Sequence, residues 1–198
     1  MGVPSGQKPV KLVVSIIFRE EKFLGYAMER LKRRYGALEP LERTMPFDFT
    51  DYYAGEFGKP LRRKLICFTK LVSKENICRI KLETNRIENR YSFEGKRTVN
   101  LDPGYVTEAK LILLTTKDYT HRVYAGKGIF AESTLFFQGG TFNPWQWTYP
   151  DYASGDMISY FNQVRDIYMA DVKRLKNKGR PAIAAGPGSS CSDRKNTL

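Results

Sequence analysis

Two adjoining segments decide the fold: KLVVSIIF, residues 11–18, and REEKFLGYAMERLKRRYG, residues 19–36. The first is almost entirely apolar and rich in β-branched residues, which predicts a buried strand with little room for a wet face. In the second, apolar residues recur at steps of three and four from Leu24 to Tyr35, and Gly36 is a natural end. We therefore expect a strand over Lys11–Phe18 and a helix over Glu20–Tyr35.

The rest of the chain continues to alternate between the two periodicities. Further strands are predicted over residues 39–49, 62–72, 98–105, 109–116, 122–125 and 129–137, and helices over 74–91 and 154–175. Ser73 and Ser154 suit the start of these helices, and Asp102-Pro103-Gly104 predicts a turn. This order predicts an α+β fold with a mostly antiparallel or mixed sheet, helices packed on one side and a ferredoxin-like first half.

Composition indicates one folded domain and a tail. Of 198 residues, 41% are hydrophobic, enough to offset the entropy of ordering a core. We expect a single domain over residues 1–176, because residues 177–198 are rich in Gly, Pro, Ala and Ser without an apolar period, which predicts a flexible basic tail. The net charge is +12, and about half of it lies in residues 173–198, so RNA is a weak candidate partner.

Cysteine usage and hydropathy bear on the compartment. The longest apolar run, Leu12 to Phe18, is too short to span a bilayer and lacks a signal-peptide cleavage site. Cys67, Cys78 and Cys191 form no CxxC pair, which argues against a disulfide framework or a structural zinc site. We expect a cytoplasmic protein with no membrane partner, and the oligomeric state stays open.

Several motifs carry a resemblance to a known family. They are Pro46–Tyr53 (PFDFTDYY), Asn100–Tyr105 (NLDPGY), Thr115–Asp118 with His121-Arg122, Gly126–Ile129 with Glu132, and Trp147–Tyr152 (WTYPDY). Together they resemble the uncharacterised bacterial domain-of-unknown-function family 4416, over nearly the whole body. The resemblance implies no assigned activity, although some members carry a "GTP-binding" label. This chain lacks the GxxxxGK[ST] run of a P-loop, and Thr116-Lys117-Asp118 lacks the spacer of the guanine-reading Thr-Lys-x-Asp signature.

Charged residues gather between positions 100 and 132, where strands and glycine-bounded turns alternate. The candidate catalytic residues are His121, Asp102 and Glu132, and the candidate ligand-binding residues are Lys110, Lys117, Arg122 and Lys127. Arginine offers a donor fork, lysine a point charge, and histidine titrates near neutral pH, so the cluster suits a phosphate or carboxylate ligand. The alternative is that these residues are solvated strand ends and turns.

The sequence also contains candidate metal ligands and a segment rich in aromatic residues. One histidine cannot build a multi-histidine metal site, whereas Asp48 and Asp51 together with Asp102 or Glu132 could hold Mg²⁺. The sequence contains no DxDxD-like run, so we favour turn roles for Asp48 and Asp51 and predict no metal; the cofactor is open. The aromatic residues between Trp145 and Tyr152 could stack on bases or a sugar, or cover the core as a lid.

Three functions remain open at this point. The first is binding, and possibly transformation, of a small anionic or phosphorylated ligand, including a nucleotide. The second is a non-catalytic scaffold or interaction protein, and the third is an RNA-binding module. The sequence favours the first slightly, and whether the protein is an enzyme stays open.

Overall fold

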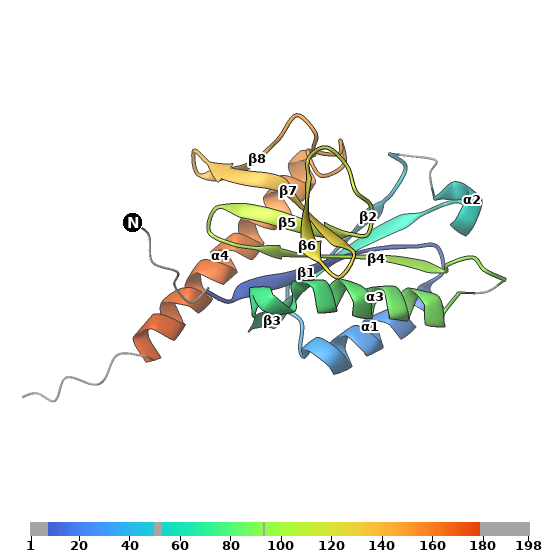
Figure 1. Cartoon of the computed structure of the whole chain (residues 1–198), viewed down its shortest axis with the longest axis horizontal. Coiled ribbons are helices and arrows are strands. Elements are labelled where there is room, and N and C mark those ends of the chain that lie inside the picture. The colour runs from blue at the N-terminus through green and yellow to red at the C-terminus, as the bar shows by residue number, and fades with distance from the viewer. Residues whose placement is uncertain (1–7, 50–52, 93, 179–198) are drawn as a thin grey trace, which may run out of the picture.

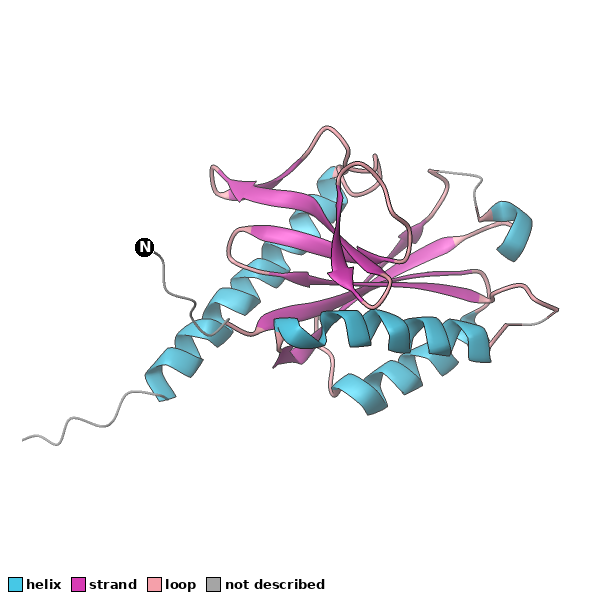
Figure 2. Ribbon diagram, in the orientation of Figure 1, coloured by secondary structure: helices cyan, strands magenta, loops and turns pink. Residues whose placement is uncertain are grey.

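The computed structural model describes residues 8–49, 53–92 and 94–178, and these form one antiparallel sheet with helices on both of its faces (Figures 1 and 2). The strands are β1 (Val10–Phe18), β2 (Arg43–Pro46), β3 (Arg62–Val72), β4 (Val99–Val106), β5 (Lys110–Thr115), β6 (Arg122–Gly126), β7 (Ile129–Gln138) and β8 (Thr141–Pro144). The helices are α1 (Glu21–Tyr35), α2 (Ala54–Phe57), the 3-10 turn η1 (Lys74–Asn76), α3 (Ile77–Arg90) and α4 (Gly155–Lys178).

The first half has the predicted ferredoxin-like arrangement. Its strands lie in the order β2-β3-β1-β4, every neighbouring pair is antiparallel, and the two long helices connect strands that are not adjacent. The second half extends the same sheet through β5, β7 and β6, and β8 pairs with the far part of β7. The α+β class and the antiparallel sheet are therefore confirmed.

The helices differ from the prediction in one respect, because they cover both faces of the sheet. All nine residues of β1 are buried, and successive side chains of a strand point to opposite faces. Leu12, Val14 and Ile16 pack with α1 and α3, whereas Val13 belongs to a second apolar cluster that α4 covers. A strand that is apolar on both faces needs cover on both, so α4 lies opposite α1 and α3 (Figure 1).

The predicted turn at Asp102-Pro103-Gly104 is wrong, because all three residues lie inside β4. β1 pairs with β4 along its whole length, but β5 pairs with it only from Gly104 onward. A Cβ at Gly104 would overlap the carbonyl oxygen of Ile112 on β5, so glycine permits this close approach. The two residues that are typical of a turn instead allow a strand junction.

Other predicted elements are confirmed with shifted ends. The β2 strand is shorter than predicted, the short helix α2 lies in the predicted loop 48–58, and β8 was not expected. Gly139 and Gly140 both have positive φ, so they form a tight hairpin into β8 and do not simply end β7. Ser73 caps η1 by accepting a bond from the Glu75 N–H. Along the described residues, no helix is both long enough and apolar enough to cross a membrane.

Candidate functional site

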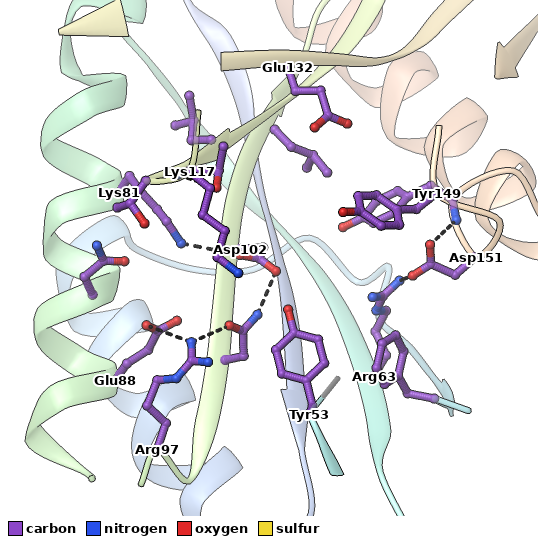
Figure 3. Close-up of a pocket in the computed structure, with 18 of the residues that line it drawn as sticks. Tyr53, Arg63, Lys81, Glu88, Arg97, Asp102, Lys117, Glu132, Tyr149 and Asp151 are labelled. Atoms are coloured by element: carbon purple, nitrogen blue, oxygen red, sulfur yellow. Dashed lines mark hydrogen bonds and ion pairs between the residues drawn. The ribbon is translucent and has the colours of Figure 1, made fainter. Parts of the chain in front are cut away.

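A cavity of about 700 Å³ opens where β4 and β5 separate (Figure 3). The two strands pair at Gly104–Val106 with Leu111–Leu113 and then diverge, so Asn100 and Asp102 on β4 face Thr115–Lys117 beyond the pairing across the gap. The remaining walls come from seven other segments: the β2–α2 connection, β3, α3, the α3–β4 connection, β6, β7 and the loop before α4. The cavity therefore lies where two strands of the sheet diverge, and loops cover part of it.

Two residues of α3 stabilise the unpaired edge of β4. The carboxylate of Glu88 accepts a hydrogen bond from the Leu101 N–H, and the ammonium of Lys81 donates to the Leu101 carbonyl at 2.9 Å. Backbone groups two residues apart in a strand point to the same side, so the N–H that Pro103 lacks is the one that would point toward β5. Proline thus ends the ladder on that side, and α3 replaces the missing strand.

A chain of ion pairs and hydrogen bonds runs along one wall of the cavity. Arg97 makes a two-pronged contact with Glu56, at 2.7 Å for each prong, and donates to Asn100 at 2.8 Å. Asn100 in turn donates to Asp102 at 2.7 Å. These contacts with Arg97 lower the pKa of Glu56, whereas burial raises the pKa of Glu88. The wall is held rigidly by paired charges.

Arg63 on β3 lies on the side of the cavity opposite Lys117 (Figure 3). Its side chain is 5% exposed, its Nη1 pairs with Asp151, and its guanidinium lies against the rings of Phe47 and Tyr152 at 4.5 and 5.0 Å from their centroids. Its Nε is buried without a partner, and its Nη2 has none among the described residues. The guanidinium is fixed in place while part of its donor capacity is unused.

Arg122 on β6 is held in a similar way. Its Nε donates to Glu132 at 3.0 Å and its Nη1 donates to the Lys117 carbonyl at 3.2 Å, while its Nη2 has no partner within the described segments. Glu132 is buried on β7 and also contacts the His121 ring at 3.1 Å. Figure 3 shows Lys117 pointing into the cavity toward Asp102.

In the carboxylates of the cavity, in contrast, every oxygen already contacts at least one donor. The four that line it are Glu88, Asp102, Glu132 and Asp151. Each of their eight oxygens contacts a donor of the chain itself: Leu101 N–H, Arg97, Lys81, Asn100, Thr134, His121 with Arg122, Tyr152 N–H and Arg63. The groups of these ion pairs that have no contact among the described residues are therefore N–H donors of the arginines.

An aromatic column crosses the surface beside the cavity. Trp145 stacks on Trp147 at 5.1 Å, Trp147 stacks on His121 at 5.8 Å, and Phe136 and Tyr119 lie at the two ends. The Trp147 indole also donates to the Ser133 carbonyl, between the parts of β7 that pair with β6 and β8. Both faces of the Trp147 ring are used inside the column, which braces the loop before α4, whereas Tyr119 at one end is 64% exposed.

The structure brings together four of the seven predicted site residues. Asp102, Lys117, Arg122 and Glu132 all line the cavity. His121 lies directly behind Glu132 and does not itself line the cavity. Lys110 at the start of β5 and Lys127 in the β6–β7 turn are exposed and lie outside the lining.

Sequence reasoning missed most of the opposite walls. Arg63, Lys81 and Arg97 gave no signal, because an isolated basic residue in a strand, helix or loop looks like a solvated one. Asp151 and Tyr149 belong to the aromatic segment that was noted, but their approach to β3 depends on the packing of α4. Arg63 lies between Arg62 and Lys64, and the sequence does not indicate which of these three basic residues is the buried one.

The described residues offer little for binding a metal ion. Within them, no group of three or more His, Cys, Asp or Glu side chains is arranged to hold a metal ion. Asp48 has no such cluster around it, and Asp51 lies outside the described residues.

Comparison with known proteins decides the family. Residues 8–168 match the family described as "Domain of unknown function (DUF4416)". The chain belongs to the DUF4416 family. Searches of curated proteins and of solved structures gave no match.

The DUF4416 match includes the whole cavity, since every lining residue falls between positions 47 and 152. The five motif segments that carried the resemblance also meet here. Each of them contributes at least one lining residue: Phe47, Asp102, Lys117 with Arg122, Glu132 and Asp151. Segments spread over a hundred residues of the DUF4416 domain thus converge on one place.

Proposed function

We propose that this protein binds a small anionic or phosphorylated ligand in the cavity between β4 and β5. One observation carries the proposal: the lining carboxylate oxygens are all engaged, whereas Arg63 and Arg122 each keep an Nη2 group without a partner among the described residues. Guanidinium donors in a low-dielectric cleft favour phosphate and carboxylate oxygens. The cavity is also of the size that small-molecule sites occupy.

Energetics favour a ligand site over a purely structural one. Arg63, Lys81, Glu88 and Glu132 are each no more than 5% exposed. Removing charged groups from water is costly even when they are paired, and an apolar core of similar volume is often as stable. A scaffold protein gains little from such a cluster beside a cavity, whereas a binding protein uses it to hold donors in position.

Five of the seven predicted residues receive a role in this proposal, and Lys110 and Lys127 receive none. Arg122 and Lys117 contact the anionic group from the β5–β6 wall, and Arg63 contacts it or a second group from the β3 wall. Glu132 orients Arg122, Asp102 orients Lys81, and His121 supports Glu132 from behind. No reaction is assigned to these groups. We place the protein in the cytosol, where the free buried thiols of Cys67 and Cys78 would stay reduced.

RNA binding is the weaker alternative. Single-stranded nucleic acid needs open ring faces along a basic groove, and the aromatic column of Trp145, Trp147 and His121 uses its faces internally. Such binding would also show a steep dependence on salt, because many phosphates would be contacted. A ligand enclosed by the cavity should lose affinity only modestly as salt increases.

A thermal-shift screen tests the proposal. Inorganic phosphate, sugar phosphates, nucleotides and dicarboxylates should include at least one compound that raises the melting temperature, because binding to the native state alone stabilises it. Arg122→Gln should strongly reduce that shift, measured against the variant's own unliganded melting temperature, which is expected to fall because buried Glu132 loses a partner. Lys110→Gln makes the same charge change outside the cavity and should retain the shift. Equal loss in both variants, or no shift with any anion, would refute the proposal.

A further inference from the structure

The structure also bears on what kind of anion the cavity suits. We infer that the ligand carries two separate anionic groups joined by a polar spacer, as in a sugar bisphosphate or a phosphorylated hydroxy acid. This inference rests on the proposed function, since it concerns the same cavity.

The first argument is the distance between the two arginines along the sheet. Arg63 is on β3 and Arg122 is on β6, and four strands lie between them in the order β3-β1-β4-β5-β7-β6. In a flat sheet the two would be roughly 24 Å apart, five steps of about 4.8 Å. Both nevertheless line one cavity, which they approach from strands at different positions in the sheet.

The close-up view (Figure 3) also shows charged groups on different sides of the cavity. Figure 3 shows Arg63 and Asp151 on one side of the cavity, Lys117 on the opposite side and Glu132, the partner of Arg122, at a third position. Lys117 and Arg122 belong to the same wall, since Arg122 donates to the Lys117 carbonyl. A single phosphate held by Arg122 and Lys117 would leave Arg63 without an anion.

The second argument is that both guanidinium groups are held in place by a carboxylate and by one further contact. Arg63 is held by Asp151 and by two aromatic rings, and Arg122 is held by Glu132 and by a backbone carbonyl. Arg63 is held through Nη1 and Arg122 through Nε and Nη1, and each leaves Nη2 without a partner in the described parts of the chain. Two such fixed donors at two walls match two anionic groups on one molecule.

Polar side chains lie between the two arginines, beside apolar lining from residues such as Phe47, Leu113 and Leu114. Asp102 and Asn100 lie on β4 between the two walls, and Figure 3 shows the Tyr53 hydroxyl pointing toward them. Carboxylate and amide oxygens have further lone pairs that accept from hydroxyl groups. This favours a hydroxylated spacer over an apolar chain.

The test compares probes that differ in the placing of their charges. Fructose 1,6-bisphosphate carries two separated phosphates, pyrophosphate carries two adjacent ones, and glycerol 3-phosphate carries one. By titration calorimetry on the full chain at one ionic strength, the bisphosphate should bind about 10- to 100-fold more tightly than either of the others, the gain expected from a second set of charge-assisted hydrogen bonds.

Variants assign the two ends. Arg63→Gln and Arg122→Gln should each remove the advantage of the bisphosphate, while only one of them should weaken glycerol 3-phosphate. If Arg63→Gln does not fold, by circular dichroism, the comparison of the three probes on wild type and on Arg122→Gln still decides the question. In Arg122→Gln, the bisphosphate and the monophosphate should then bind alike.

Two results would overturn the inference, and they are distinguishable. If glycerol 3-phosphate or pyrophosphate binds as tightly as the bisphosphate and is lost in both variants, the cavity holds one anionic group, and the proposed function stands without this refinement. If none of these probes binds and the broader anion screen also fails, the proposed function falls together with the inference.

Discussion

At the scale of single residues, Arg63 is the clearest case of a charge held inside the protein. Within the described residues its ion-pair partner is Asp151, which is also buried and accepts from the Tyr152 N–H at 2.8 Å. Removing one partner of a buried pair leaves the other charge uncompensated, and this costs far more than losing an exposed pair.

We therefore expect Asp151→Asn to lower the free energy of unfolding by about 3 kcal/mol. Denaturant unfolding monitored by the two tryptophans, Trp145 and Trp147, would measure it. The control is Asp156→Asn, which removes the partner of Arg43 in an exposed pair and should cost less than about 1 kcal/mol. Equal effects of the two substitutions would mean that Arg63 does not depend on Asp151.

At the scale of elements, α1 and α3 are joined by a polar clamp centred on Glu83. Its carboxylate accepts from Arg34 at 2.7 and 2.8 Å, from the Tyr35 hydroxyl at 2.9 Å and from Arg79 at 3.2 Å. These donors, Arg34 first, lower the pKa of Glu83 to about 2. The lowered pKa means that the ionised form stabilises the folded state.

This stabilisation should be fully present above pH 4.5 and disappear as the pH falls toward 2. Glu83→Gln is expected to lower the free energy of unfolding by about 1 to 2 kcal/mol at pH 7, less than the full shift implies because Arg34 and Arg79 are exposed. The difference from wild type should shrink below pH 4.5. Unfolding curves at several pH values would test this, with Glu29→Gln on the exposed face of α1 as control; a constant difference would contradict it.

The junction of β4 and β5 is a second feature at this scale, and Gly104 is the residue that permits it. We expect Gly104→Ala to be severely destabilising, by more than about 2 kcal/mol, because the added Cβ would overlap backbone of β5 and the strands would have to separate. Gly25→Ala, where the same group meets open space in α1, should instead stabilise by about 0.4 to 1 kcal/mol. Thermal unfolding of the two variants checks both signs, and a mild effect at Gly104 would show that the fork can widen.

At the scale of the whole molecule, the burial along α4 indicates where the folded domain ends. Its apolar face is buried through Val172, whereas residues 173–177 are exposed and Leu175 is 49% exposed. The predicted domain end near residue 176 stays a prediction, although α4 continues to Lys178.

Truncation after Asn177 should leave the melting temperature essentially unchanged, because the last residues before that point already contribute no buried surface. Scanning calorimetry of the truncated and full chains would measure this. A loss of several degrees would show that the segment beyond residue 178 docks on the domain.

The sequence predicts the first half of the fold better than the second. In the first half, strands and helices carry their own periodicity and caps, so the ferredoxin-like order could be predicted from β1, α1, β3 and α3. In the second half, β8 is too short to show a period, and Pro103-Gly104 has the same local chemistry in a turn and in a strand that lacks a neighbour. Local signals do not distinguish those two settings.

By itself, the sequence determined the long helices and most strands, their order and one wall of the cavity, because neighbours along the chain set helix and strand periodicity. The tertiary structure alone decided that Arg63, Lys81, Arg97 and Asp151 face the same space as Asp102 and Glu132. Those residues lie on separate elements, and only strand pairing and the docking of α3 and α4 bring them together. The physical reason is that the burial and pairing of a charge depend on what packs against it, and for this cavity the packing partners are distant in the chain.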